Sequence, residues 1–194
     1  GDAISVSDSL SPLGAITLMN NVISGAGSRA INISSASGLD LRVPQVQGNT
    51  GSGNALNYME LSGWQARENT AWSFGAGALP VVVTGSWNVP AGQTVTFPAG
   101  GLVKVYGAQL FVAGSLVVNG TAQDPVVFTS LRDDSVGGDT NADGAGTSPA
   151  RGDWSGIYAQ GNSAHLVMAH ARVRFAGVSS NLAAEIDLQS SQFE

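Results

Sequence analysis

The residues best suited to chemistry are acidic and lie close together in one segment. Residues 139–144 read Asp-Thr-Asn-Ala-Asp-Gly, which matches D-x-N-x-D-G, the first half of an EF-hand calcium loop. Positions 1, 3 and 5 of such a loop turn oxygen atoms toward one point, and the glycine at position 6 permits a sharp bend. Calcium takes six to eight oxygen ligands. The spacing therefore predicts Asp139, Asn141 and Asp143 as ligands of Ca²⁺.

The segment departs from an EF-hand at position 12, where a bidentate Glu is expected and Ala150 stands. Asp133, Asp134 and Asp153 are the candidates to complete the ligand shell. Without a cation, the Asp side chains of this segment repel one another, and Arg132 is the only counter-charge that we expect near them. The alternative is a solvated, flexible acidic loop. A bound calcium ion would order the segment rather than take part in catalysis.

Tryptophan side chains are the candidates for sugar binding, because exposed aromatic rings stack on pyranose rings. Trp64 and Trp72 lie in an irregular segment and are the predicted carbohydrate-binding residues. The alternative is that they pack in the core, as we expect for Trp87 and Trp154, which begin strands.

Two further motifs favour ordinary structural roles. Residues 151–153 spell the integrin tripeptide Arg-Gly-Asp, but they lie where strands resume, which favours a turn before a strand. His165 and His170 are five residues apart, so a strand would place them on opposite faces. We therefore expect two surface histidines that share no metal ion.

An enzyme would need paired carboxylates, as glycosidases do. Only four Glu are present, and their spacing singles out none of them. Arg172 and Arg174 share one face of a predicted strand, but we expect no acid beside them. A groove on one sheet face lined by three or more carboxylates and an Arg would indicate catalysis.

The elements that must position these residues are short apolar runs separated by Gly, Pro, Asn or Ala-Gly, too short for helices. Trp87 and Leu110 are 23 residues apart, Val95 and Leu116 are 21 apart, and Val103 and Val127 are 24 apart. Strands that recur in the same order stack in parallel. The runs are Val95–Phe97, Leu102–Val105, Leu110–Val112, Leu116–Val118 and Val126–Phe128. They predict an all-β solenoid with coils of about 21–25 residues.

The N-terminal half gives a weaker repeat. Aligning Ala30 with Ala55 predicts that Ile31 pairs with Leu56 and Ile33 with Tyr58, and places Asn32 on Asn57. Asparagines suit turns, and they also form side-chain ladders between coils. We expect turn roles for most of the candidates, which are Asn20, Asn32, Asn49, Asn57 and Asn119.

We expect a single domain over residues 1–194 that is part of a longer chain or assembly. Residues 1–14 are a first strand or cap, 15–130 form coils, 131–152 are an Asp-rich insert, and 153–194 form further coils.

Composition excludes several classes of function. The net charge is −6 and the sequence pI is near 4.7. There is one Lys, and the Arg residues form no cluster, so the basic footprint of nucleic-acid or anionic-membrane binding is missing. The absence of Cys excludes disulfides and cysteine zinc sites. No apolar run approaches the ~20 residues of a transmembrane helix.

Several stretches resemble a known family. They are VPAGQTVTFPAGGLVKVYG, LFVAGSLVVNGTAQDPVVFTS, RDDSVGGDTNADG, GDWSGIY and HARVRFAG. Together they resemble the right-handed parallel β-helix (pectin-lyase-like) regions of bacterial secreted and cell-surface, adhesin-like proteins. The resemblance spans about Val81–Gly177 and is looser over residues 15–61. It implies a right-handed solenoid and an extracellular or cell-surface location in bacteria.

These observations predict a non-catalytic structural or adhesive module, such as a stalk, adhesin segment or filament subunit. The expected partners are copies of the chain or neighbouring β-helix coils, which pair through uncapped strand edges, and a polysaccharide or cell surface. The alternative is a carbohydrate-active enzyme, a lyase or hydrolase of acidic polysaccharides, because the same scaffold carries both kinds of function.

Overall fold

The protein is an all-β structure built from parallel strands. The computed structural model describes residues 1–8, 17–35, 45–63, 65–66, 69–73, 78–181 and 184–194. Within these ranges all the helices and strands assigned are β-strands, and each pairing between them is parallel. The described residues contain no helix that is long and apolar enough to cross a membrane. The predicted all-β class is confirmed.

The strands form four sheets. The eight-stranded sheet consists of β1 (Ile4–Asp8), β4 (Arg29–Ser35), β7 (Leu56–Ser62), β9 (Val81–Val83), β12 (Leu102–Val105), β15 (Val126–Ser130), β18 (Ala171–Val173) and β21 (Gln192–Phe193). The seven-stranded sheet consists of β2 (Thr17–Met19), β5 (Gln45–Gln47), β8 (Thr70–Ser73), β11 (Thr94–Pro98), β14 (Ser115–Asn119), β17 (His165–Ala169) and β20 (Glu185–Gln189). The four-stranded sheet consists of β10 (Trp87–Val89), β13 (Leu110–Val112), β16 (Ile157–Ala159) and β19 (Val178–Ser180), and the two-stranded sheet of β3 (Val22–Ser24) and β6 (Thr50–Ser52).

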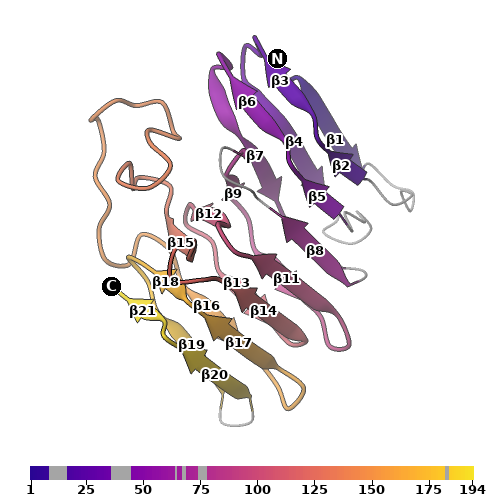
Figure 1. Ribbon diagram of the computed structural model, residues 1–194, viewed down its shortest axis with the longest axis vertical. Helices are drawn as coiled ribbons and strands as arrows, with labels where there is room; N and C mark the ends of the chain where they lie inside the picture. Colours follow the sequence, from indigo (N-terminus) through magenta and orange to yellow (C-terminus); the bar gives the residue numbers. More distant parts are fainter. Residues whose placement is uncertain (9–16, 36–44, 64, 67–68, 74–77, 182–183) are drawn as a thin grey trace.

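The chain visits the sheets in a repeating order (Figure 1). From β1 to β6 it passes twice through the eight-, seven- and two-stranded sheets, and from β9 onward it passes repeatedly through the eight-, four- and seven-stranded sheets. We call each passage from the eight-stranded sheet back to it a circuit. Each return places a strand beside the one from the previous circuit. Paired residues lie 20 residues apart at Met168 and Leu188, and 28 apart at Leu18 and Val46. This spread is wider than the predicted 21–25.

Two of the three predicted offsets in the central stretch are confirmed. Trp87 pairs with Leu110, and Val95 pairs with Leu116. The third is wrong by one residue, because Val127 pairs with Leu102. All five residues of β15 are buried, so its apolar run shows no alternation between faces and leaves the register undefined in the sequence.

The predicted register of the N-terminal half is wrong. Ile31 pairs with Met59, and Ile33 pairs with Leu61. The register also shifts between Arg29 and Ile31, as a β-bulge does. Apolar residues lie on both faces of β7, with Leu56 and Tyr58 on one face and Met59 and Leu61 on the other. The apolar pattern therefore does not distinguish the predicted alignment from the observed one.

The core is a column of side chains between the sheets. Phe97 of β11 meets Trp87 of β10 edge to face at 5.7 Å between ring centroids, and it meets Phe128 of β15 at 5.5 Å. These strands belong to three different sheets, so the rings tie the sheets together. Trp154 is also buried, and its Nε1 donates to the carbonyl of Arg174 at 2.9 Å. The expectation that Trp87 and Trp154 pack inside is confirmed.

Asparagine is found both in a turn and in a side-chain ladder, but the expectation of turn roles for most of the candidates is wrong, because Asn32, Asn57 and Asn119 lie in β4, β7 and β14. Asn20 occupies a turn with a left-handed φ of 55°. Asn49 is buried; its Oδ1 accepts from the side-chain and backbone nitrogens of Asn21 at 2.7 and 3.2 Å, and its Nδ2 donates to the Leu18 carbonyl at 2.8 Å. Asn49 therefore forms a ladder between neighbouring circuits.

We expect Asn49→Ala to lower the free energy of unfolding by about 1–3 kcal/mol, because buried backbone groups lose their partners. Asn119→Ala is the matched control, since Asn119 is exposed at a strand end. Urea unfolding of both variants measures the difference. Equal losses would show that the ladder contributes nothing.

The segment between β15 and β16 contains no strand, and residues paired across it are 45 apart at Val126 and Ala171. Figure 1 shows it as a long orange loop beside the sheets. We call residues 131–156 the insert; it extends four residues beyond the predicted bounds of 131–152, because β16 begins at Ile157. A Cβ on Gly137, whose φ is 72°, would collide with Leu102, so the insert lies close against β12. Val82, Lys104 and Thr129 stand opposite one another on adjacent strands, alternate with core residues and are nevertheless fully buried.

Candidate metal centre

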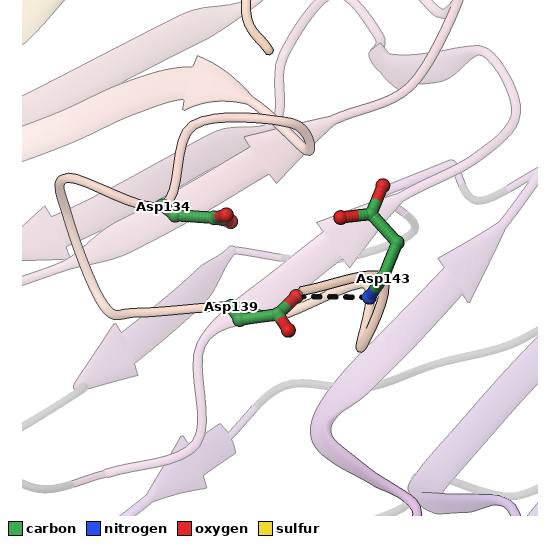
Figure 2. A group of neighbouring side chains, drawn as sticks. All are labelled: Asp134, Asp139 and Asp143. Atoms are coloured by element: carbon green, nitrogen blue, oxygen red, sulfur yellow. Dashed lines mark hydrogen bonds between the residues drawn. The ribbon is translucent and has the colours of Figure 1, made fainter. Parts of the chain in front are cut away.

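Three carboxylates meet in the insert. Asp134, Asp139 and Asp143 each place an oxygen within 4.8 Å of the others (Figure 2). The D-x-N-x-D-G motif folds around Asp139, whose Oδ1 accepts from the Asp143 amide at 3.1 Å and whose Oδ2 accepts from the Gly144 amide at 2.8 Å. Asp134 lies in the first arm of the insert, residues 133–134, and the motif lies in the second arm, residues 138–144. The cluster therefore joins two segments that are five residues or more apart in sequence.

Two oxygen atoms of this region are shielded from solvent and accept no hydrogen bond from the described residues: Asp134 Oδ1 and Asn141 Oδ1. The amide nitrogen of Asn141 donates to Asp143 Oδ2 at 2.8 Å, which turns the Asn141 side chain toward the cluster. A buried acceptor without a donor costs free energy. A hard cation would satisfy such oxygens, and oxygen is the donor that calcium prefers.

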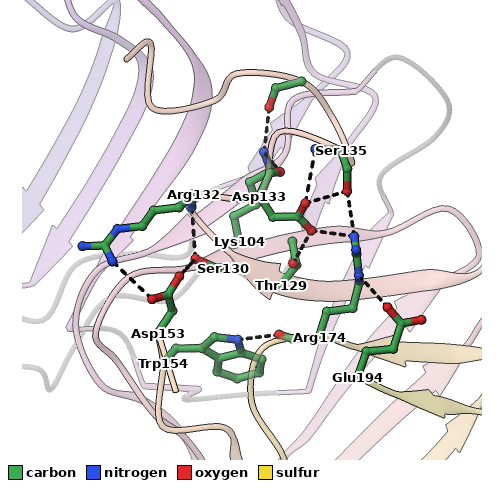
Figure 3. Close-up of polar contacts among 11 residues, drawn as sticks. Lys104, Thr129, Ser130, Arg132, Asp133, Ser135, Asp153, Trp154, Arg174 and Glu194 are labelled. Atoms are coloured by element: carbon green, nitrogen blue, oxygen red, sulfur yellow. Dashed lines mark hydrogen bonds and ion pairs between the residues drawn. The ribbon is translucent and has the colours of Figure 1, made fainter. Parts of the chain in front are cut away.

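Asp133 lies outside the cluster, and its side chain attaches the insert to the eight-stranded sheet. Its side chain is 2% exposed. Ser135 Oγ and Thr129 Oγ1 each donate to it at 2.6 Å, and Arg174 Nη1 lies 2.6 Å from its Oδ2 (Figure 3). Burial raises the pKa of Asp133, but the hydrogen bonds from Ser135 and Thr129 and the charge of Arg174 together outweigh burial, so the pKa lies below its ordinary value.

Asp153 also lies outside the cluster. Its Oδ2 accepts from Ser130 Oγ at 2.6 Å and from the Ala150 amide at 3.0 Å, and Arg132 Nη1 lies 3.2 Å from its Oδ1. The Arg-Gly-Asp tripeptide thus has its carboxylate turned toward the sheet, while Gly152 takes a left-handed φ of 89°. This arrangement agrees with the turn that the sequence favours.

Lys104 is a central residue of this region that sequence reasoning missed. Its ammonium is fully buried under the insert and donates to the carbonyls of Asp133 at 2.9 Å and Gly138 at 2.8 Å. Burial lowers the pKa of Lys104, while the charges of Asp134, Asp133 and Asp139 oppose that shift. The available signal was the single Lys of the chain, set within the apolar strand LVKV.

Arg174 is the second missed residue, and the expectation that no acid accompanies it is wrong. It pairs with Asp133 and also with Glu194, whose Oε2 lies 3.1 Å from Arg174 Nε. Arg132 is therefore not the only counter-charge near the acids. Lys104 and Arg174 come from the circuits before and after the insert, 29 and 41 residues from Asp133, so local sequence cannot show the contacts.

A hollow of about 370 Å³ lies between the insert and the segment after β18. Arg132, Asp133, Asp134, Arg174 and Phe175 are among its lining residues. The guanidinium of Arg174 also stacks on the Phe175 ring at 5.1 Å. Two carboxylates line the hollow, one of them paired with Arg174, so it falls short of the three-carboxylate groove that we expect of an enzyme.

The remaining candidates lie elsewhere. Trp64 is outside the described residues; Trp72 belongs to β8, but its side chain is outside what the structure describes. His165 is exposed on β17, and its Nδ1 lies 2.9 Å from Glu185 Oε2. His170 occupies the following turn with a φ of 46°. No protein-family model matches the chain, and no match was found among curated proteins or solved structures.

Proposed function

We propose that the chain is a right-handed parallel β-helix segment of the pectin-lyase-like kind that its sequence resembles. Its function is that of a non-catalytic structural or adhesive module of a bacterial secreted or cell-surface protein. The repeated return of the chain to the eight- and seven-stranded sheets, with each new strand parallel to the previous one, supports the solenoid. Parallel crossover connections are right-handed in about 98% of cases, which supports the hand.

The structural role is supported by the ion pairs of the charged side chains. Along the eight-stranded sheet, charged side chains of one circuit form ion pairs with those of the next. Arg29 contacts Asp2 at 3.1 Å and Glu60 at 2.8 Å, and Thr84 donates to Glu60 at 2.9 Å. Asp133, Arg174 and Glu194 continue this pattern near the C-terminal end. An enzyme would keep such carboxylate and guanidinium groups free to contact substrate, whereas in this protein they connect successive circuits.

We further propose that the insert binds Ca²⁺ through Asp134, Asp139 and Asp143, with Asn141 Oδ1 as a fourth ligand. Asp134 supplies the carboxylate that position 12 of the loop lacks. The two unpartnered buried oxygens support this assignment. Asp133 and Asp153 serve the scaffold instead of the ion, because each already pairs with an arginine. Binding of calcium joins the two arms of the insert.

Assembly through strand edges belongs to the same proposal. Leu188 of β20 and Phe193 of β21 are 44% and 43% exposed, and they line an apolar hollow of about 330 Å³. Pairing of further circuits, from a neighbouring segment or a second copy, would cover them. Sedimentation at increasing concentration tests self-association. A constant monomer mass, equal in Leu188→Ser, would remove the second copy as a partner.

Activity on acidic polysaccharides separates this function from the enzymatic alternative. We expect neither new reducing ends nor unsaturated products from pectate or alginate with excess calcium, because the acids near the hollow are committed to ion pairs or to the metal. Asp134→Asn is the control variant. Product formation by the wild type that Asp134→Asn abolishes would establish the enzyme instead.

A further inference from the structure

Lys104 joins the two arms of the insert that carry the clustered carboxylates. Its Nζ donates to the Asp133 carbonyl at 2.9 Å and to the Gly138 carbonyl at 2.8 Å. Each of these residues directly precedes a member of the cluster, Asp134 in one arm and Asp139 in the other. One ammonium group therefore fixes the backbone on which both carboxylates are mounted.

The position of Lys104 makes this contact rigid. Val103 and Val105 of the same strand point into the core, so Lys104 points outward onto the insert, and it is fully buried there. The charges of Asp134, Asp133 and Asp139 all attract the ammonium. A hydrogen bond from a charged donor is about twice as strong as a neutral one. An apolar side chain at this position would fill the space but would leave both carbonyls without a donor.

We propose that Lys104 is a positioning residue for the candidate metal site: it holds Asp134 against Asp139 when no calcium is bound. The inference rests on the proposed calcium site. Lys104 and calcium connect the same two arms, the lysine through backbone carbonyls and the ion through side-chain oxygens. The insert of the wild-type protein is therefore ordered on the sheet before the ion arrives. In a chain without the lysine, order in the insert depends on calcium.

Hydrogen exchange of the full chain, followed by mass spectrometry, tests this inference. In chelator, we expect amides of residues 133–144 to exchange about tenfold faster or more in Lys104→Met than in the wild type, because two charge-assisted hydrogen bonds are lost. Saturating calcium should restore most of the protection. Arg172→Met is the matched control: it removes an exposed cation from β18 of the same sheet and should change nothing in the insert.

The strands β11 and β14 serve as an internal reference, because they belong to the seven-stranded sheet, away from the insert. Equal exchange of the insert in wild type and Lys104→Met in chelator would overturn the role of Lys104. Faster exchange in β11 and β14 as well would also overturn it, since Lys104 would then support the whole stack. If exchange is faster only in the insert and calcium does not reverse it, Lys104 attaches the insert to the sheet, but the proposal that calcium connects the same two arms is refuted.

Discussion

Arg174→Met should lower the free energy of unfolding by about 3–5 kcal/mol, because it removes the ion-pair partner of the buried Asp133 carboxylate. The Arg174 side chain is 20% exposed and contacts Asp133 at 2.6 Å and Glu194 at 3.1 Å. Asp133 connects three circuits: its backbone carbonyl binds Lys104, and its carboxylate binds Thr129 and Arg174. Loss of the arginine therefore weakens the attachment of the insert to the sheet.

Arg172→Met is the control for this variant. Arg172 is exposed on β18, two residues away, so its replacement should cost no more than about 0.5 kcal/mol. Equilibrium unfolding in guanidinium chloride compares the two variants at neutral pH. Similar stabilities would contradict the anchoring role of Asp133 and Arg174.

The pH dependence of this difference has a definite sign. The pKa of Asp133 is lowered in the folded protein, so its contribution to stability is fully present above the unfolded pKa of about 3.9. The contribution is lost as the pH falls through the folded value. The stability gap between wild type and Arg174→Met should therefore narrow below about pH 4. A gap that stays constant down to the acid transition would show that the charge of Asp133 is not involved.

Calcium is expected to stabilise the protein by about 2.7 kcal/mol at a hundredfold excess over its Kd, provided that it binds the folded state alone. Thermal unfolding in calcium and in chelator measures the change. Ionic strength is held constant, because salt also screens the repulsion among the acids. No shift in the midpoint would remove the calcium proposal.

Variants identify the ligands. Asp139→Asn and Asp134→Asn should each lose most of the calcium-dependent stabilisation. Asp124→Asn should keep it, because Asp124 is an exposed acid in the turn between β14 and β15. The Asp134 variant is the more informative of the two, because only the folded structure places Asp134 beside the D-x-N-x-D-G motif. Full retention of the calcium-dependent stabilisation in Asp134→Asn would show that a residue other than Asp134 supplies the missing ligand.

The sequence predicts the parts of the fold that depend on local patterns. Val95 and Leu116 pair as expected because strict alternation in β11 and β14 excludes one-residue slips, which would turn the apolar face toward solvent. The proposed calcium motif is also local, since its three candidate oxygen ligands lie within five residues. The predicted registers are wrong where both faces of a strand carry buried residues, as in β7 and β15.

The sequence does not reveal contacts that depend on how far the insert folds back. Lys104 looks like an exposed strand residue, and Arg174 looks solitary. The number of residues between circuits is 45 to 50 at the insert and 20 to 28 elsewhere, so no fixed offset relates these side chains to Asp133.

The proposed calcium site is tested most directly by anomalous diffraction from crystals grown with calcium, recorded at a wavelength where calcium scatters anomalously. We predict one peak bounded by the carboxylates of Asp134, Asp139 and Asp143, with Asn141 Oδ1 in contact, and no peak there in Asp139→Asn. A wild-type map without a peak at this position would contradict the claim that the insert is a calcium site.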